Sequence, residues 1–243
     1  MTSRSYSDAE AAALYNVLNP WSPSDDFYLR LVMAARSVLD IGCGTGIMLH
    51  RARSAGHTGR LVGIDPDQAA LDIARRRSDV EWLESTAASM TWDGDFDLAV
   101  MMSHAFQCFV TDDDVHSSLA AIHRALIDGG QFVFETRNPA AREWEGWSPA
   151  NPIDVVDPAG LAVRVTYQVL SVEADVVTFT ETTSDPAGTV LRVDRASLRF
   201  LAPDVLMRIL TDAGFVIGAQ QGGWFGEELA PTSTEIVISA RKV

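Results

Sequence analysis

A glycine-rich turn followed by an acidic residue is the strongest chemical signal in the sequence. The segment VLDIGCGTG has glycines at 42, 44 and 46 directly after an apolar run that contains Asp40. Glycine lets the backbone approach a ligand closely, and the helix expected from about Gly46 offers unpaired N–H groups to a negative group. Asp65, nineteen positions after Gly46, ends the next apolar run, where a carboxylate can accept hydrogen bonds from both ribose hydroxyls. We therefore expect a ligand that contains a nucleoside.

The spacing of the glycines argues against a dinucleotide. The fingerprint G-x-G-x-x-G would need glycine at position 47, where Ile47 stands, and the third glycine comes one position early, at Gly46. A nicotinamide-dependent oxidoreductase is thus disfavoured but stays open as an alternative. A non-catalytic nucleoside-binding protein is the second alternative, because a fold alone does not imply catalysis.

With Asp40 two positions before the first glycine, the chain resembles the class I S-adenosylmethionine-dependent methyltransferases, whose first motif is D-x-G-x-G-x-G. The likeness covers residues 37–138 and resumes at 203–243. It implies S-adenosyl-L-methionine as cofactor and a transferase that moves a methyl group to an N or O atom of a small molecule by in-line displacement. It also implies an α/β fold with a doubly wound, Rossmann-like, mostly parallel sheet in the strand order 3-2-1-4-5-7-6, the last strand being antiparallel.

The resemblance also implies which residues contact the cofactor. Asp40 and the backbone from Gly42 to Gly44 would face the amino and carboxylate groups of the methionine part, and Asp65 would bind the ribose with Pro66 beside the adenine. The family often has an acidic residue near the adenine amine where this chain has Thr86 and Ala87, so that Glu84 could also serve. The implied cofactor-binding residues are Tyr15, Trp21, Asp40, Gly42, Cys43, Gly44, Gly46, Asp65, Pro66, Thr86, Ala87 and Ser103.

Tyr15 and Trp21 belong to an N-terminal segment, ALYNVLNPW, that resembles the part of the family that covers the cofactor. Tyr15 could donate a hydrogen bond to the cofactor carboxylate. Packing of these aromatic rings against the domain explains them equally well.

Catalytic candidates follow two of the expected strands. Ser103 and His104 match the segment that flanks the sulfonium and the incoming nucleophile in the family. A hydroxyl acceptor would need a general base, for which His104 is the first candidate and Glu135 the second, whereas a neutral amine would need none. The structural alternatives are a packed loop histidine and a surface network around Glu135 and Arg137.

Alternating apolar and amphipathic runs predict the elements that position these residues. Strands are expected at 37–41, 60–64, 80–83, 96–102 and 131–136, with helices near 46–55, 67–77 and 112–127. The last of these helices is expected to begin with the capping pair Thr111 and Asp114 and to close at Gly129-Gly130. A helix at 203–213 and strands near 215–220 and 235–241 complete the sheet.

Residues 139–202 interrupt this pattern. Strands at 161–172, 175–183 and 189–200 predict an inserted antiparallel β meander. We expect the chain to divide into a cofactor-covering segment at 1–36, a methyltransferase core at 37–138 and 203–243, and a β-rich substrate or lid element at 139–202. Trp144 and Trp147 would line the acceptor pocket or fill the core beneath the lid. The competing role for the insertion is an oligomerisation surface, which would make the protein a homodimer.

Composition excludes several classes of protein. The chain has 19 basic and 33 acidic residues, a net charge of −14 and a pI near 4.6, so nucleic acid is not an expected partner. Its single lysine, Lys242, stands next to the end of the sequence, which argues against a Walker-type phosphate loop and a pyridoxal Schiff base.

Metal and membrane association are not expected either. Two cysteines are too few for a disulfide framework, and no histidine has companions at metal-ligand spacing. The longest runs without Asp, Glu, Lys or Arg are 14 residues, shorter than the roughly 20 that a membrane helix needs. The first residues lack an apolar signal core, and on that ground we expect a cytoplasmic protein.

Overall fold

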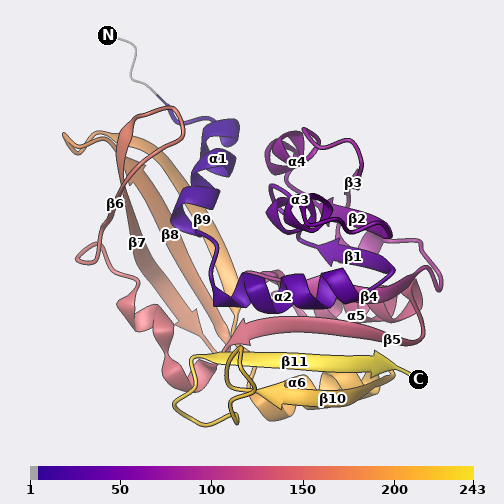
Figure 1. Cartoon of the computed structure of the whole chain (residues 1–243). Helices are drawn as coiled ribbons and strands as arrows, with labels where there is room; N and C mark the ends of the chain where they lie inside the picture. The colour runs from indigo at the N-terminus through magenta and orange to yellow at the C-terminus, as the bar shows by residue number, and fades with distance from the viewer. Residues whose placement is uncertain (1–4) are drawn as a thin grey trace.

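The computed structural model describes residues 5–243 and contains two β-sheets, a seven-stranded sheet A and a four-stranded sheet B (Figure 1). Residues 1–4 of the predicted N-terminal segment lie outside the described residues. Sheet A consists of β1 (Ser37–Ile41), β2 (Arg60–Asp65), β3 (Glu81–Glu84), β4 (Phe96–Met101), β5 (Leu126–Arg137), β10 (Phe215–Gln221) and β11 (Glu235–Lys242). Its order is β3-β2-β1-β4-β5-β11-β10, and β11 runs antiparallel to both neighbours while β1 to β5 are parallel. The predicted doubly wound fold and strand order are confirmed.

Helices cover both faces of sheet A. These helices are α2 (Pro23–Ala34), α3 (Ile47–Ser54), α4 (Gln68–Ala74), α5 (Asp112–Ala125) and α6 (Pro203–Asp212), and a further helix, α1 (Asp8–Leu18), lies away from this sheet. Apolar side chains of α2 and α3 pack on one face and those of α5 and α6 on the other. The capping box of Thr111 and Asp114 starts α5 as predicted. A similar box of Ser7 and Glu10 starts α1, a helix that the sequence analysis did not assign.

The junction between α5 and β5 differs from the prediction. The helix ends at Ala125 rather than at Gly129-Gly130, and the strand begins at Leu126 rather than at 131. Leu126 pairs with Phe96, and the register then shifts before the next pair. The two glycines therefore form an irregularity inside the strand, and Gly129 has a φ of 78° that suits glycine.

Sheet B is the inserted antiparallel meander, with one strand more than predicted. It contains β6 (Ile153–Val156), β7 (Ala162–Glu173), β8 (Val176–Ser184) and β9 (Val190–Arg199) in sequential order. The additional strand, β6, has only four residues and directly follows a proline-rich segment, so the sequence analysis did not assign it. Two 3₁₀ turns, η3 (Pro139–Ala141) and η4 (Glu143–Gly146), connect β5 to it.

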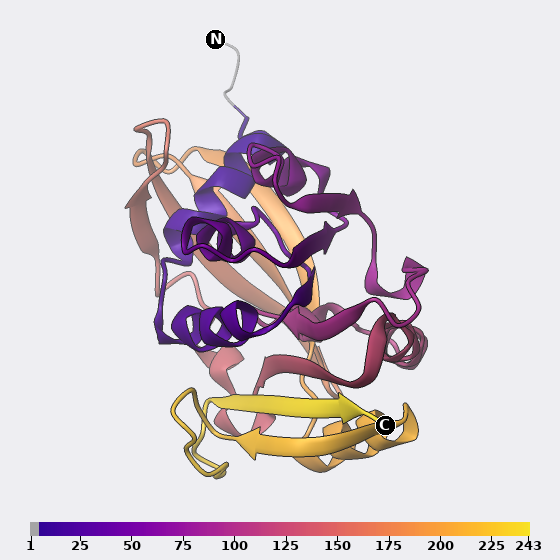
Figure 2. The same cartoon turned by 45° about the vertical axis from the view of Figure 1, so that its right-hand side comes forward.

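Helix α1 lies between sheet B and the helices of the core, as both views show (Figures 1 and 2). Leu14 of α1 packs against Val163, Val165 and Leu191 on one face of sheet B. In Figure 1 the arrowheads of β1 and β5 point toward α1 and sheet B, so the carboxyl ends of the parallel strands face the insertion. Open α/β sheets bind ligands at this edge.

Among the helices of residues 5–243, none is both long and apolar enough to span a membrane.

Candidate functional site

The glycine turn is fastened to the end of β2. The backbone N–H groups of Gly42 and Cys43 both donate to the carbonyl oxygen of Ile64, at 2.8 and 3.0 Å. One carboxylate oxygen of Asp65 accepts from the N–H of Gly44 at 2.7 Å, and the other accepts from the N–H of Asp67 at 2.8 Å. Asp65 therefore holds the turn in shape, and each of its oxygens keeps a second lone pair for a ligand.

The three glycines of the turn have positive φ angles but different surroundings. A Cβ on Gly46 would lie 2.4 Å from the ring of Trp82, and one on Gly42 would lie 3.0 Å from the Cβ of Ala105. A Cβ on Gly44, whose φ is 53°, would meet no atom within 4 Å. Gly46 is thus required for packing, whereas the space beside Gly44 is open to a ligand.

Asp40 is the most unusual side chain of the site. It is fully buried near the end of β1, and neither carboxyl oxygen has a hydrogen-bond partner in the described chain. Burial raises its pKa to about 8, and the charges of Asp65 and Glu135 add to the effect. A buried carboxyl without a partner is costly unless a ligand completes its hydrogen bonds, and an ammonium group would do so.

His104 is held between two carboxylates. Ser103 and His104 both have left-handed backbone angles, with φ of 52° and 61°, a conformation that is uncommon for residues other than glycine. The backbone N–H of His104 donates to Glu135 at 3.0 Å, and its ring Nε2 lies 2.9 Å from a carboxylate oxygen of Glu235. Glu135 is buried and also accepts a hydrogen bond from the Tyr28 hydroxyl, and burial raises its pKa.

Tyr28 and Glu235 were missed by the sequence analysis. Their partners lie 107 and 131 positions away in the chain, so no local pattern could connect them. Glu235 opens the strand that pairs with β5, where it lies opposite Arg137.

Helix α1 reaches the same edge of the sheet. Tyr15 lies near Ser103, and although the residue is 44% exposed, partial burial of its hydroxyl raises its pKa. Asn16, a third residue that the sequence analysis missed, accepts a hydrogen bond from the Thr45 hydroxyl at 2.8 Å and so links α1 to the glycine turn. Trp21 lies at the start of α2, where its indole N–H donates to Asp26 and the Arg51 guanidinium lies 5.1 Å from its ring.

The residues expected near an adenine follow β2 and β3. Pro66 and Thr86 are exposed, while Ala87 is buried at the start of a 3₁₀ turn, η1 (Ala87–Ser89). The Thr86 hydroxyl lies 2.9 Å from that of Ser89 and caps this turn. Glu84 is exposed on the edge strand β3.

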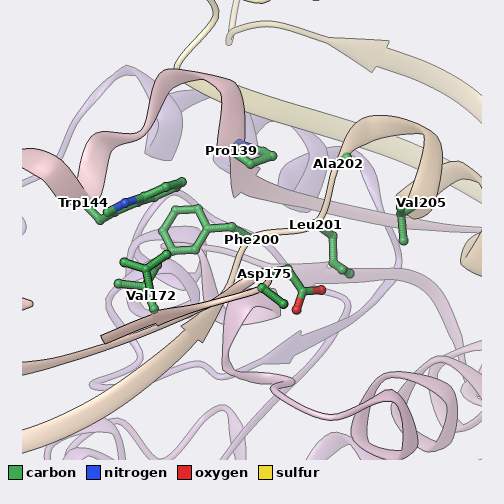
Figure 3. Close-up of a pocket in the computed structure, with 10 residues that line it drawn as sticks. Pro139, Trp144, Val172, Asp175, Phe200, Leu201, Ala202 and Val205 are labelled. Carbon is green, nitrogen blue, oxygen red and sulfur yellow. The ribbon is translucent and has the colours of Figure 1, made fainter. Parts of the chain in front are cut away.

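Trp144 and Trp147 occupy different places. Trp144 packs edge-on against Phe200, with ring centres 4.5 Å apart. Both line a pocket between Pro139, at the start of the insertion, and Ala202, at its end (Figure 3). None of the expected cofactor-binding residues lines that pocket. Trp147 packs against Phe179 of sheet B at 4.8 Å and lies 5.4 Å from the guanidinium of Arg137 at the end of β5.

Acidic groups dominate the carboxyl edge of sheet A. Asp40, Asp65 and Glu135 interact electrostatically, and Glu235 adds to the field at Glu135. Such a site favours a ligand with positive charge and disfavours the pyrophosphate of a dinucleotide.

Replacement of Asp40 by Asn should reveal the energetic cost of this site in the ligand-free protein. The pKa of Asp40 is about 8 in the folded chain, above its ordinary value in the unfolded chain. Between these two pKa values the carboxyl ionises more readily in the unfolded chain, so the stability of the wild-type protein falls as the pH rises through this range. The variant lacks this loss, so its stability relative to wild type should rise by about 2–4 kcal/mol between about pH 4 and pH 8. Denaturant unfolding of both proteins across this range measures the difference, and parallel pH profiles would contradict the expectation.

Comparison with known proteins agrees with the geometry. Residues 38–130 match the family model of a methyltransferase domain. The chain is 27% identical to the cypemycin N-terminal methyltransferase of a Streptomyces species, over 84% of this chain and 82% of the relative. Its fold is similar to a S-adenosylmethionine-dependent methyltransferase from Clostridium acetobutylicum, with a TM-score of 0.76, 14% identity and coverage of 96% and 98% of the two chains.

A further structure, of an amino pentose methyltransferase from Micromonospora echinaspora with S-adenosylmethionine bound, has a TM-score of 0.70 and 20% identity, covering 94% of this chain and 97% of that one. Neither the nicotinamide-dependent nor the non-catalytic alternative is supported by these similarities. The glycine turn, the strand order and the matched relatives together show that the chain belongs to the class I S-adenosylmethionine-dependent methyltransferases and is a transferase that uses this cofactor.

Proposed function

We propose that the enzyme methylates a nitrogen or oxygen atom of a small molecule that is held between the carboxyl edge of sheet A and sheet B. The single observation that carries the proposal is the buried, unpartnered Asp40 beside the open space at Gly44. The name of one relative, the cypemycin N-terminal methyltransferase, supports a nitrogen acceptor.

The cofactor contacts that we propose follow from the chemistry of the donors. Asp40 would accept from the ammonium group of the methionine part, and the N–H groups of the glycine turn and the Tyr15 hydroxyl would face its carboxylate. Asp65 would accept from the ribose hydroxyls. Pro66, Thr86 and Ala87 would border the adenine, and Ser103 would lie near the sulfur. Trp21 would act through the packing of α2 on α3, since its indole N–H is bonded to Asp26.

When bound, S-adenosylmethionine supplies a methyl group on a positively charged sulfur, which is already a strong electrophile. The protein then has to align the acceptor atom and exclude water, and orientation contributes about 7–11 kcal/mol in favourable intramolecular models. His104 would accept the acceptor's proton, with Glu235 holding the ring in place. Glu135 is engaged by Tyr28 and by the His104 backbone, which suits it to hold the loop more than to carry a proton.

Ligand titration tests the cofactor part of the proposal. S-adenosylhomocysteine should bind and raise the thermal stability of the protein by mass action, whereas NAD should not. Asp65→Ala should weaken S-adenosylhomocysteine about 10- to 100-fold, because the ribose loses a charged acceptor. Calorimetry measures the affinities, and tight binding of NAD without a response to S-adenosylhomocysteine would overturn the proposal.

Gly44 tests whether the turn approaches the ligand. Gly44→Ala should weaken S-adenosylhomocysteine at least about tenfold, because the methyl group enters the space that the ligand needs. Gly129→Ala is the matched control: its φ is also positive, at 78°, a Cβ there meets no atom within 4 Å, and it lies at the opposite end of the sheet. Equal affinities for the two variants would show that the turn does not touch the cofactor.

His104 distinguishes a hydroxyl from an amine acceptor. With a hydroxyl, His104→Ala should lower kcat by about 10²–10⁴ and leave S-adenosylhomocysteine affinity unchanged, because a general base is lost. With a neutral amine the loss should be small. Glu235→Gln should act in the same direction more weakly, and His116→Ala, on the exposed side of α5, should have no effect. Normal turnover with a large loss of cofactor affinity would make His104 a cofactor contact instead.

A further inference from the structure

A row of polar side chains crosses the face of sheet B that turns toward the core. Tyr167 of β7 pairs with Glu181 of β8, which in turn pairs with Asp194 of β9. Directly opposite residues on neighbouring antiparallel strands project to the same face. Val165, two positions before Tyr167, packs against α1 from this face, so the whole row faces α1 and the carboxyl edge of sheet A.

Side-chain contacts connect this row to the end of β5. The Tyr167 ring lies 6.1 Å from the ring of Phe179, which lies 4.8 Å from that of Trp147. The Trp147 ring in turn lies 5.4 Å from the guanidinium of Arg137 at the end of β5. Burial and the neighbouring Glu181 carboxylate raise the pKa of the Tyr167 hydroxyl. The polar row is therefore joined by a series of contacts to the carboxyl edge of sheet A.

Glu181 has an acidic neighbour and no ion-pair partner among residues 5–243. Its pairing partner across the sheet is Asp194, and like charges in that position are destabilising. The nearby Arg192 is already shared by Asp194 and Asp8. Within residues 5–243 Glu181 forms no ion pair, and burial raises its pKa. A half-buried carboxylate in this setting lacks the positive partner that would offset the cost of its burial.

We propose that Glu181, positioned by the Tyr167 hydroxyl, binds a cationic amino group of the methyl acceptor. This inference rests on the proposed function and narrows it to acceptors that carry an ammonium group. The anchored group is distinct from the atom that receives the methyl group, because an amine bound to a carboxylate is protonated and has no lone pair for displacement. The reacting atom would lie near His104.

Two matched probes test the proposal on the complete protein loaded with S-adenosylhomocysteine. 1,5-Diaminopentane and 5-amino-1-pentanol differ only in whether the second end is an ammonium or a hydroxyl group. Wild type should prefer the diamine about tenfold, as expected for a charge-assisted hydrogen bond. NMR titration or calorimetry measures this ratio, which requires neither turnover nor knowledge of the natural acceptor.

Three variants then locate the preference. Glu181→Gln should abolish it, and Tyr167→Phe should reduce it, because the carboxylate remains but loses the hydroxyl that orients it. Glu173→Gln, an exposed change at the end of β7, should leave it intact. Affinity for S-adenosylhomocysteine should be unchanged in all three, which also shows that each variant is folded.

The outcomes separate this inference from the proposed function. Failure of wild type to bind S-adenosylhomocysteine would count against the proposed function. Normal binding of S-adenosylhomocysteine, with equal affinity for the two probes or with the preference intact in Glu181→Gln, would overturn the role of Glu181 alone. Preference for the amino alcohol would point to a hydroxyl-rich acceptor and would also overturn it.

Discussion

The burial of the Asp40 carboxyl without a partner is the constraint on which the site depends. The group lies near the end of a central strand, and Asp65 and Glu135 raise its pKa further. Such an arrangement lowers the stability of the empty protein, and the chain retains it at a place where a positively charged ligand would relieve it. The surrounding strands and helices bury this carboxyl completely, but the space beside Gly44 stays open.

The two sheets contribute different side chains to the site. Sheet A supplies the turn, the carboxylates and the His104 loop from the ends of adjacent strands, as parallel sheets generally do. Sheet B contributes aromatic and polar side chains opposite them, and Trp147, which precedes sheet B in the insertion, contacts Arg137. Arg137 also donates to Gln107 at 3.0 Å, and Gln107 donates to the carbonyl of Arg199 at the end of β9. This network fixes the insertion to the core at the carboxyl edge of sheet A.

Local signals in the sequence were sufficient for the order of sheet A, because alternation of strands and helices dictates a right-handed, doubly wound arrangement. They were misleading where tertiary pairing overrides them: Gly129 and Gly130 are typical of a helix end, but pairing of Leu126 with Phe96 draws that segment into β5. The glycine turn and Asp65 could be predicted because their spacing is local. The pairing of His104 with Glu235, and of Tyr28 with Glu135, depends on how distant segments meet, which a single sequence does not encode in any visible pattern.

Helix α1 is attached to the insertion near its start and to the glycine turn near its end. Near its start the Tyr6 hydroxyl donates to Asp157 at 2.9 Å, and Arg192 of sheet B pairs with Asp8, whereas Asn16 near its other end holds Thr45 of the glycine turn. Because one short helix holds both, a change in the position of sheet B would be transmitted through α1 to the backbone of the glycine turn beside Thr45.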